Sequence, residues 1–372
     1  MQSIHFHQKV TANGEKISKS RQDASEELIY MSAKSRTKSK ITCNKLQPNI
    51  TDNNNILAEY LRTFVYYVKA RSNVYVFAFA TLISLLLGSH LSALDYSIAI
   101  RVVSASYFMA LATYIYNDIT DFELDKINQT NRPSVTGKAT KRQLIRLVFV
   151  LNGIALLFTS SVSLYALYIS VLFIALGIAY SHPKLNLKDK FPLKTVVTAA
   201  GAGLLSLLGG IAALTTTIDS DYNNNFSSFL PIIYAALFFF AFFFILGPLG
   251  DIGDLKGDRL VGRRTFPIVL GIRSTIVFML SIPLTIILMA VLLAYCSYHD
   301  NLSIASSSSS GTIFINLPGI YLIIGTSIST LVFILRISKK ANANDALAIK
   351  SVRPKMRFLH IMLQISLLLT FM

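Results

Sequence analysis

Nine strongly apolar segments follow one another along the chain from residue 74 to its end. They cover residues 74–94, 97–116, 144–163, 164–180, 196–217, 229–247, 275–296, 314–335 and 358–372. Most approach the ~20 residues that an α-helix needs to cross the hydrocarbon core of a bilayer. The pattern predicts an all-α, polytopic membrane bundle of about nine transmembrane helices. Because the last segment is short and the third and fourth are nearly contiguous, eight spans are the alternative.

The beginning of the chain has a different character. Residues 1–55 are polar and lysine-rich and contain no apolar run long enough for a secretory signal. We predict a mostly disordered basic tail there and a single membrane domain over residues 56–372. Between residues 56 and 71 the apolar positions recur at helical spacing, with Arg62 and Lys69 off that stripe. This pattern is typical of a helix that lies in the membrane interface.

Composition supports a membrane protein and gives it an orientation. The chain is 53% hydrophobic, with a mean hydropathy of +0.53, which excludes a soluble protein of this length. It has 35 Lys and Arg against 19 Asp and Glu, but no nucleic-acid motif accompanies them, so we predict contact with the lipid bilayer and no nucleic-acid partner. Basic residues fill the loops after the second, fourth, sixth and eighth segments and are absent from the alternate loops. The positive-inside rule therefore places these basic loops and the tail on the cytoplasmic side.

The second apolar segment runs into an acidic stretch, Asn117-Asp118-Ile-Thr-Asp121-Phe-Glu-Leu-Asp125. If the helix continues, Asn117, Asp121 and Asp125 share one face, because they recur every four residues. Carboxylates stacked at this spacing repel one another, and a divalent cation would relieve the repulsion. The stretch predicts a cation site; the simpler interpretation is a solvated polar end of a helix.

A second acidic cluster follows the sixth apolar segment on the same predicted side. Asp251, Asp254 and Asp258 are spaced i, i+3 and i+7, which again places them on one helical face. Two such faces opposed across a bundle would suit Mg²⁺, which takes carboxylate and phosphate oxygens. The alternative is a cytoplasmic loop that is merely rich in charge.

The fourth segment ends on that side with Tyr180-Ser181-His182-Pro183-Lys184. Arg132 and Lys184 are candidates to bind phosphate, Arg bidentately and Lys as a point charge. The alternative is an interfacial tyrosine beside ordinary cations that set the topology.

Taken together, the motifs resemble the UbiA superfamily of intramembrane prenyltransferases. The resemblance rests on Asn117-Asp118-x-x-Asp121-x-x-x-Asp125, Asn131-Arg132-Pro133, the Tyr180 to Lys184 turn, and Asp254-x-x-x-Asp258 leading into Gly262-Arg263-Arg264-Thr265. It implies helices around a central cavity, a prenyl diphosphate and a lipophilic acceptor as substrates, and Mg²⁺ as the cofactor. Its implied metal ligands are Asn117, Asp121, Asp125, Asp254 and Asp258, of which the four aspartates are catalytic, with Asp118 and Asp251 supporting. Its implied diphosphate contacts are Arg132, Tyr180 and Lys184.

One position departs from the family pattern. Members often have Arg-Pro at the entry to the first span, whereas this chain has Arg71-Ser72, so we assign Arg71 no role as a ligand. There is also no evident Ser-His-Asp or Cys-His nucleophile set, which disfavours covalent catalysis. The motifs can instead neutralise the charge of a diphosphate as it leaves an allylic prenyl chain. Its departure would leave an allylic carbocation in a water-poor cavity.

Several alternatives remain at this level. The sequence around Arg132 and Arg263 is similar to that of the family branch that prenylates geranylgeranylglyceryl phosphate for archaeal lipids. It is also compatible with the branches that prenylate aromatic acceptors of the quinone, tocochromanol, chlorophyll or haem pathways. An ion-coupled transporter is more distant, because its acids should lie near the membrane midplane. A membrane phosphotransferase would need an Asp-Gly-Ala-Arg-type motif, which the sequence lacks. Nothing in the sequence predicts an oligomeric state.

Overall fold

The computed structural model describes residues 53–89, 94–127, 131–217, 229–304, 315–341 and 346–371. The tail predicted over residues 1–55 lies almost wholly outside these ranges. Backbone contacts divide the chain into Met1–Leu57 and Ala58–Met372, and the second unit contains the helical bundle.

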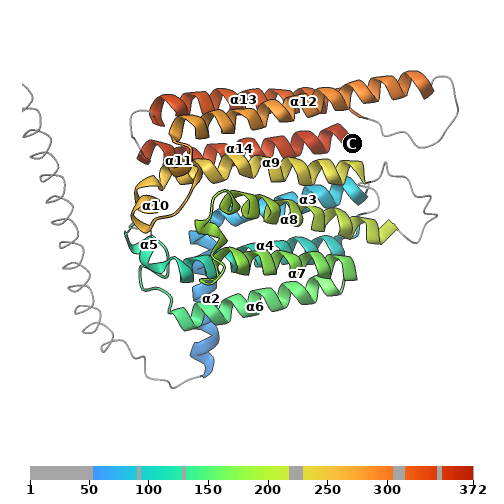
Figure 1. Cartoon of the computed structure of the whole chain (residues 1–372). Coiled ribbons are helices and arrows are strands. Elements are labelled where there is room, and N and C mark those ends of the chain that lie inside the picture. The colour runs from blue at the N-terminus through green and yellow to red at the C-terminus, as the bar shows by residue number, and fades with distance from the viewer. Residues whose placement is uncertain are drawn as a thin grey trace, which may run out of the picture. The chain divides into compact units, whose positions relative to one another are not determined.

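Among the described residues of this unit, the long helices run side by side (Figure 1). They are α3 (Tyr75–Ser89), α4 (Tyr96–Thr120), α6 (Lys141–Ser160), α7 (Leu164–Ser181), α8 (Leu193–Thr217), α9 (Leu230–Gly253), α12 (Ile272–Ile304), α13 (Leu317–Ala341) and α14 (Ala346–Phe371). Among the described residues, eight helices are long and apolar enough to cross a membrane. The ninth predicted segment, residues 358–372, forms the second half of α14, whose first half is rich in Lys and Arg.

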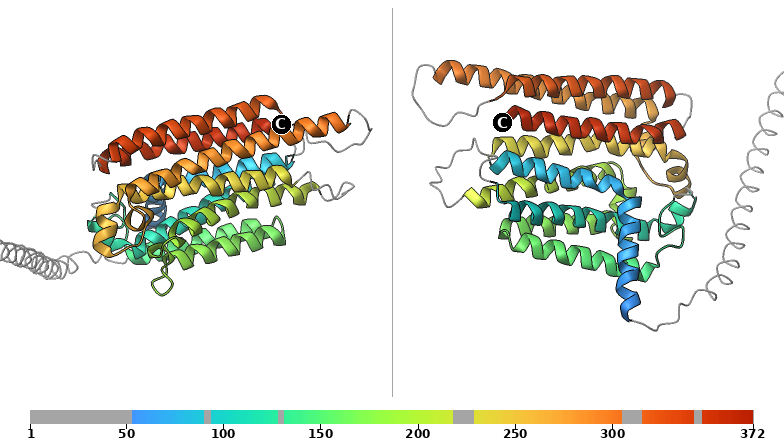
Figure 2. Two further views of the ribbon diagram at one scale, coloured as in Figure 1. Left: turned by 45° about the horizontal axis from the view of Figure 1, so that its top comes forward. Right: turned by 180° about the vertical axis from the view of Figure 1, so that it is seen from behind.

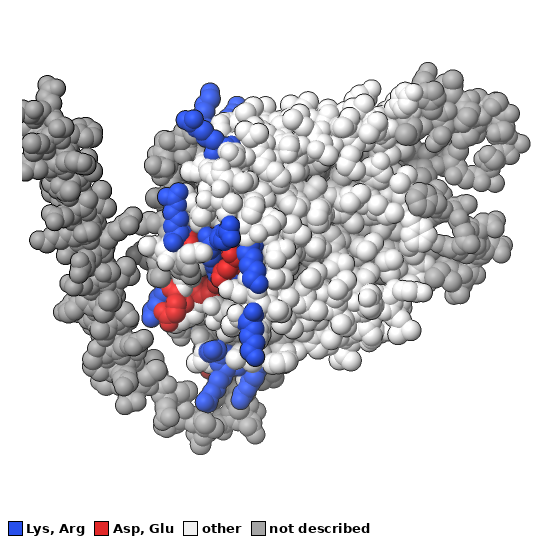
Figure 3. All heavy atoms as spheres, viewed as in Figure 1, with Lys and Arg blue, Asp and Glu red and all other residues white. Residues whose placement is uncertain are grey.

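Short elements gather at one end of the bundle. These are α5 (Phe122–Ile127), η3 (Leu187–Asp189), α10 (Leu255–Val261) and α11 (Phe266–Val269). Figure 3 shows Lys, Arg, Asp and Glu side chains concentrated at this end, while the rest of the visible face is uncharged. We call it the charged end. The loops that the sequence assigned to one side of the membrane therefore do lie together.

The helix α2 spans Asn53–Ala70, and its part from Ala58 onward lies across the charged end, transverse to the long helices (Figures 1 and 2). Tyr67 is fully buried, and Arg146 donates a 2.9 Å hydrogen bond to the Tyr60 hydroxyl. This arrangement fits the predicted interfacial helix. It also holds the residue that follows α2, Arg71, at the charged end, where its backbone amide donates to the Tyr67 carbonyl oxygen.

Two hydrophobic cores lie on either side of α9. One core is built mainly from α3, α4, α6, α7 and α8, and the other from α12, α13 and α14. Phe239 packs into the first core and Phe242 into the second. Because α9 is apolar on all faces, it can be shared in this way without exposing a polar stripe to either core.

Small residues bring α3 and α8 into backbone contact. A Cβ atom added at Gly209 would overlap the Thr81 carbonyl group. Thr81 Oγ1 lies 2.8 Å from the Leu205 carbonyl oxygen on α8 and 2.7 Å from Ser106 Oγ on α4. Lipid provides little hydrophobic driving force between helices, so such close approach and interhelical hydrogen bonds hold them together.

Gly209→Ala should destabilise the bundle by about 1–3 kcal/mol, the usual cost of overpacking a core, seen as a lower midpoint of thermal unfolding in detergent. Gly325→Ala on α13 is the control, because a Cβ atom there would have no neighbour within 4 Å. Equal midpoints for the two variants would contradict the close packing of α3 against α8.

Candidate active site

Both acidic clusters lie at helix breaks of the same form. The helix α4 ends at Thr120 and α5 begins at Phe122, yet the Asp121 amide still donates to Asn117 and the Asp125 amide to Asp121. The break between α9 and α10 at Asp254 is bridged in the same way, with Asp254 donating to Gly250 and Asp258 to Asp254. Each cluster therefore keeps a nearly helical register, as its spacing predicts.

Two arginines hold the first cluster from outside α4 and α5. Arg71 Nε lies 3.1 Å from Asp118 Oδ2, and its Nη2 contacts Asp118 Oδ1, so the pairing is bidentate. Arg132 Nη1 lies 2.9 Å from the same Oδ1 and also contacts Asp125. Asp118 is completely buried, so these two guanidinium groups neutralise a carboxylate that water does not reach.

Asp121 lies between two further cations. Lys188 Nζ is 2.9 Å from Asp121 Oδ1, and Arg263 Nη2 contacts the same atom. Burial alone would raise the pKa of Asp121, but Arg263 and Lys188 lower it below its ordinary value. Asp121 is thus held ionised. The Arg263 Nε atom is 2.6 Å from Asp189 Oδ1, which anchors η3 to the same cluster.

The second cluster is paired in the same manner. Lys194 Nζ lies 2.5 Å from Asp251 and 3.6 Å from Asp258, and Arg353 Nη2 lies 2.9 Å from Asp254. Arg263 Nη1 is also 3.7 Å from Asp258, so this arginine connects the two clusters. Asp251 and Asp258 are buried, and burial raises the pKa of the Asp258 carboxyl.

The clusters differ in one respect from the cation cages that the spacing suggested. Within the described ranges, no three His, Cys, Asp or Glu side chains lie close enough together to hold a metal ion. Protein cations instead neutralise the carboxylates, because an unpaired buried charge would be costly. The Oδ2 atoms of Asp251 and Asp258 are buried and receive no hydrogen bond from any described residue. Asp258 Oδ2 lies 3.6 Å from Lys194 Nζ, and carboxylate oxygens of this kind are ligands that Mg²⁺ prefers.

Of the three predicted phosphate ligands, the structure places Arg132 and Tyr180 at the site and leaves Lys184 exposed. Arg132 lies in the first cluster, as described above, and Tyr180 lines the cavity beneath it. Lys184 is exposed, and its backbone amide lies 3.3 Å from His182 Nδ1. Lys188 and Lys194 from the same basic stretch contact the carboxylates instead.

Six residues of the site were not predicted from the sequence. They are Arg71, Lys188, Asp189, Lys194, Arg263 and Arg353. Arg263 lies in the Gly262-Arg263-Arg264-Thr265 motif on which the family resemblance rests, so this motif could have identified it as a residue of the site. Lys188 and Lys194 were hidden among lysines that set the topology, and Arg353 lies on α14, far from either acidic motif.

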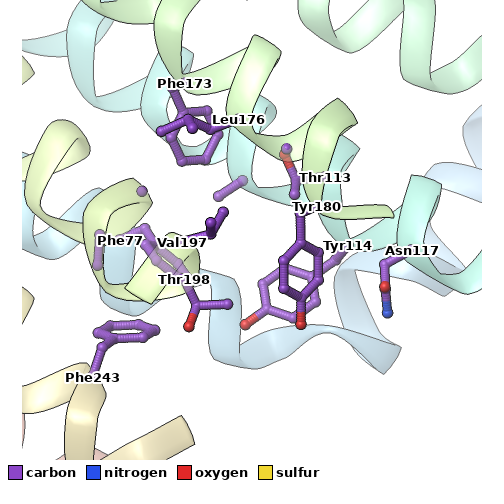
Figure 4. A pocket seen from close by; sticks show the side chains of 14 residues that line it. Phe77, Thr113, Tyr114, Asn117, Phe173, Leu176, Tyr180, Val197, Thr198 and Phe243 are labelled. Carbon is purple, nitrogen blue, oxygen red and sulfur yellow. The ribbon is translucent and has the colours of Figure 1, made fainter. Parts of the chain in front are cut away.

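An apolar cavity of about 120 Å³ begins beside the first cluster. It lies among α3, α4, α7, α8 and α9, with Asn117 and Tyr180 toward one end and Phe173 and Leu176 toward the other (Figure 4). Its other lining residues are Phe77, Ala110, Thr113, Tyr114, Gly177, Val197, Thr198, Gly201, Ala202 and Phe243. We call it the inner cavity. Its apolar and aromatic lining suits a hydrocarbon chain.

The fold and the site define an integral, multi-pass helical membrane protein with a charge-paired site above an apolar cavity. The chain belongs to the UbiA prenyltransferase family, whose model matches residues 76–356. Membership of this family, predicted from the motifs, is thereby confirmed.

Known relatives agree with this assignment. The chain is 29% identical over 180 residues to the digeranylgeranylglyceryl phosphate synthase of Sulfurisphaera tokodaii, and the match covers 48% of this chain and 58% of that protein. The chain thus spans little more than half the length of this curated relative. A solved structure from work on digeranylgeranylglyceryl phosphate synthase in membranes has a TM-score of 0.59 at 19% identity, covering 84% of this chain and 98% of that one. A UbiA homologue from Archaeoglobus fulgidus, bound to DMAPP and Mg²⁺, has a TM-score of 0.52 at 15% identity, covering 81% and 98%. These structures establish the shared fold.

The stability of the ligand-free protein should fall as the pH rises from about 4 to about 6. Burial raises the pKa of Asp125 from its ordinary 3.8 to about 6, against the opposing effect of Arg132. A carboxyl whose pKa is raised on folding stabilises the protein fully at pH below 3.8, and this contribution is lost as the pH rises through 6. Thermal unfolding in detergent without divalent cations measures the trend.

Asp125→Asn should flatten this part of the pH dependence, because an amide cannot ionise. Glu123→Gln is the control, since Glu123 is an exposed neighbour on α5. An unchanged slope in the Asp125→Asn protein would show that another group is responsible.

Proposed function

We propose that this protein transfers a prenyl group from an allylic prenyl diphosphate to a lipophilic acceptor, with Mg²⁺ as its cofactor. The observation that carries the proposal is the position of two carboxylate clusters, with their basic partners, at the end of the bundle where Asn117 and Tyr180 line an apolar cavity. A diphosphate with a long hydrocarbon chain matches both parts. The family, and the DMAPP and Mg²⁺ bound to the Archaeoglobus fulgidus homologue, support the same substrate class.

Within this proposal the carboxylate faces hold the cation. The ligands are Asn117, Asp121, Asp125, Asp254 and Asp258, supported by Asp118 and Asp251. Bound Mg²⁺ would neutralise the diphosphate and so make it a better leaving group. Arg132 and Tyr180 are proposed contacts of the diphosphate, and the ion pairs described above favour Lys188 over the exposed Lys184 for the same role.

The basic side chains that neutralise the carboxylates in the ligand-free protein can bind the diphosphate during the reaction. In the ligand-free protein, Lys188 and Arg263 are engaged by Asp121 and Arg132 by Asp118 and Asp125. Once a cation occupies these carboxylates, the same donors can turn to the diphosphate oxygens, where charge-assisted hydrogen bonds are strong. They would stabilise the negative charge that grows on the diphosphate as the bond to carbon breaks.

The inner cavity completes the chemistry. The carbon–oxygen bond between the prenyl C1 and the diphosphate breaks, and a bond from the acceptor nucleophile to C1 forms, with the proton of the nucleophile released. Phe77, Phe243 and Tyr114 present aromatic rings to this space, which can stabilise positive charge on the prenyl carbon. The apolar lining excludes water, which would otherwise capture the same carbon.

The acceptor that the relatives favour is geranylgeranylglyceryl phosphate. The Sulfurisphaera tokodaii relative is named for a product with two geranylgeranyl groups on one glyceryl phosphate. We also propose that the charged end faces the cytoplasm. This orientation follows from the positive-inside rule and from the gathering of Lys and Arg at that end.

Asp121→Asn and Asp254→Asn should each lower Mg²⁺-dependent transfer at least ~100-fold, the order seen when a group that stabilises transition-state charge is removed. The assay supplies labelled geranylgeranyl diphosphate and a panel of acceptors to purified protein in vesicles. Glu123→Gln is the matched control, because it removes an exposed carboxylate from the same stretch. Full activity in both aspartate variants would sink the assignment of the metal ligands.

Lys188→Met should weaken binding of an unreactive prenyl thiodiphosphate by about 10–100-fold in Mg²⁺, since a hydrogen bond to a charged group contributes ~1.5–3 kcal/mol. Lys184→Met and Lys190→Met should change binding less than threefold, because both side chains are exposed. Calorimetric titration gives the Kd values. The reverse order of effects would return the diphosphate contact to Lys184.

A further inference from the structure

A second cavity lies on the outer side of the inner one, among α4, α6 and α7. Its volume is about 460 Å³, and we call it the outer cavity. It is lined by Ala112, Thr113, Tyr116, Ile145, Val148, Phe149, Asn152, Gly153, Leu156, Ile174, Gly177 and Ile178. This lining includes three uncharged polar side chains and no charged one. Ile145, Phe149 and Ile178 are exposed, so the cavity opens toward lipid.

The length of the outer cavity suits one lipid chain in one leaflet. Along α6 it extends from Ile145 to Leu156, which is roughly 16 Å at 1.5 Å per residue. This is about half of the ~30 Å hydrocarbon core. Gly153 lines the cavity, and a Cβ atom added there would have no neighbour within 4 Å, so a larger side chain at this position has room to extend.

The two cavities meet at the charged end. Thr113 and Gly177 line both of them, and a Cβ atom added at Gly177 would lie 2.9 Å from Thr113 Oγ1. The partition is therefore one residue thick on each of α4 and α7. Tyr116 lines the outer cavity, and the next residue, Asn117, lines the inner one. Two chains lying in the two cavities would thus bring their head groups together beside the first acidic cluster.

A cation marks the charged end of the outer cavity. Arg142 precedes Ile145 by three residues and Phe149 by seven, so it lies on the same face of α6. Its side chain is exposed, and no ion pair joins it to any residue within the described ranges. A guanidinium at the level of the head groups, above an apolar groove, matches a lipid with a phosphate head.

We propose that the outer cavity binds the acceptor: a lipid with a single branched hydrocarbon chain and a phosphate head group. The inner cavity then takes the donor chain, and the partition at Thr113 and Gly177 keeps the two chains apart. This inference rests on the proposed function. It assigns Gly153 and Arg142 a role in acceptor specificity, which neither acidic cluster provides.

Filling the outer cavity should raise the KM for the acceptor and spare the donor. Gly153→Leu should raise the KM for geranylgeranylglyceryl phosphate about tenfold or more, with the KM for geranylgeranyl diphosphate changed less than twofold. Gly325→Leu is the matched control, because Gly325 is an exposed glycine on α13 that also has open space at its Cβ position. Equal acceptor KM values for the two variants would overturn the proposal.

The head-group part is tested by Arg142→Gln. We expect the acceptor KM to rise about fivefold or more at low ionic strength, where an exposed charge pair is least screened. Arg273→Gln is the control, since Arg273 is an exposed arginine near the start of α12. The same change in both variants would reject a specific role for Arg142.

Photolabelling separates this inference from the proposed function. A diazirine-bearing analogue of the single-chain glyceryl phosphate lipid should label residues 145–178 in the wild type and not in Gly153→Leu. Unlabelled single-chain acceptor should compete, and two-chain phospholipid should not; equal competition would identify an ordinary bilayer lipid and overturn the proposal. If the wild type transfers no prenyl group yet shows this Gly153-dependent labelling, the proposed function fails and the lipid site stands.

Discussion

Neutralisation of buried carboxylates at the edge of the bundle is the constraint on which the charged end depends. Asp118, Asp121 and Asp251 are nearly inaccessible to water, and an unpaired buried charge would destabilise the fold. Their basic partners lie just after α2, between α5 and α6, in η3, just after α10 and at the start of α8. The ion pairs therefore do two things at once: they satisfy the acids, and they fix the connecting segments against the ends of the helices.

Glycine has opposite effects on helix packing at different places in the bundle. At Gly209 the missing side chain lets α3 and α8 come into backbone contact, which closes the bundle. At Gly153 the missing side chain leaves open space beside the outer cavity. At Gly177 it keeps the partition against Thr113 thin. A membrane bundle can thus be held tightly along one helix pair and remain hollow beside the next. The inner cavity lies beside the first acidic helix break, where Asn117 lines it.

The sequence predicts the features that depend on local periodicity. Apolar length predicts the spans, and the four-residue and three-residue spacings predict acidic faces that survive the breaks at Asp121 and Asp254. The partners of those faces are not local. Arg71 and Asp118 are 47 residues apart, and the choice of Lys188 over Lys184 depends on how the loop after α7 turns into η3. Local pattern cannot distinguish these side chains from lysines that only set the topology.

Charge balance explains how one site can be stable alone and still receive a highly charged ligand. Within the part of the chain that the structure describes, seven carboxylates and six basic side chains form the ion pairs at the charged end. A divalent cation alone would give this set an excess of positive charge, and a diphosphate alone would deepen its negative excess. Arriving together, the two nearly cancel, and every side chain can exchange one charged partner for another. Binding then exchanges one set of ion pairs for another and leaves no charged side chain unpaired. This avoids the desolvation cost of an isolated buried charge.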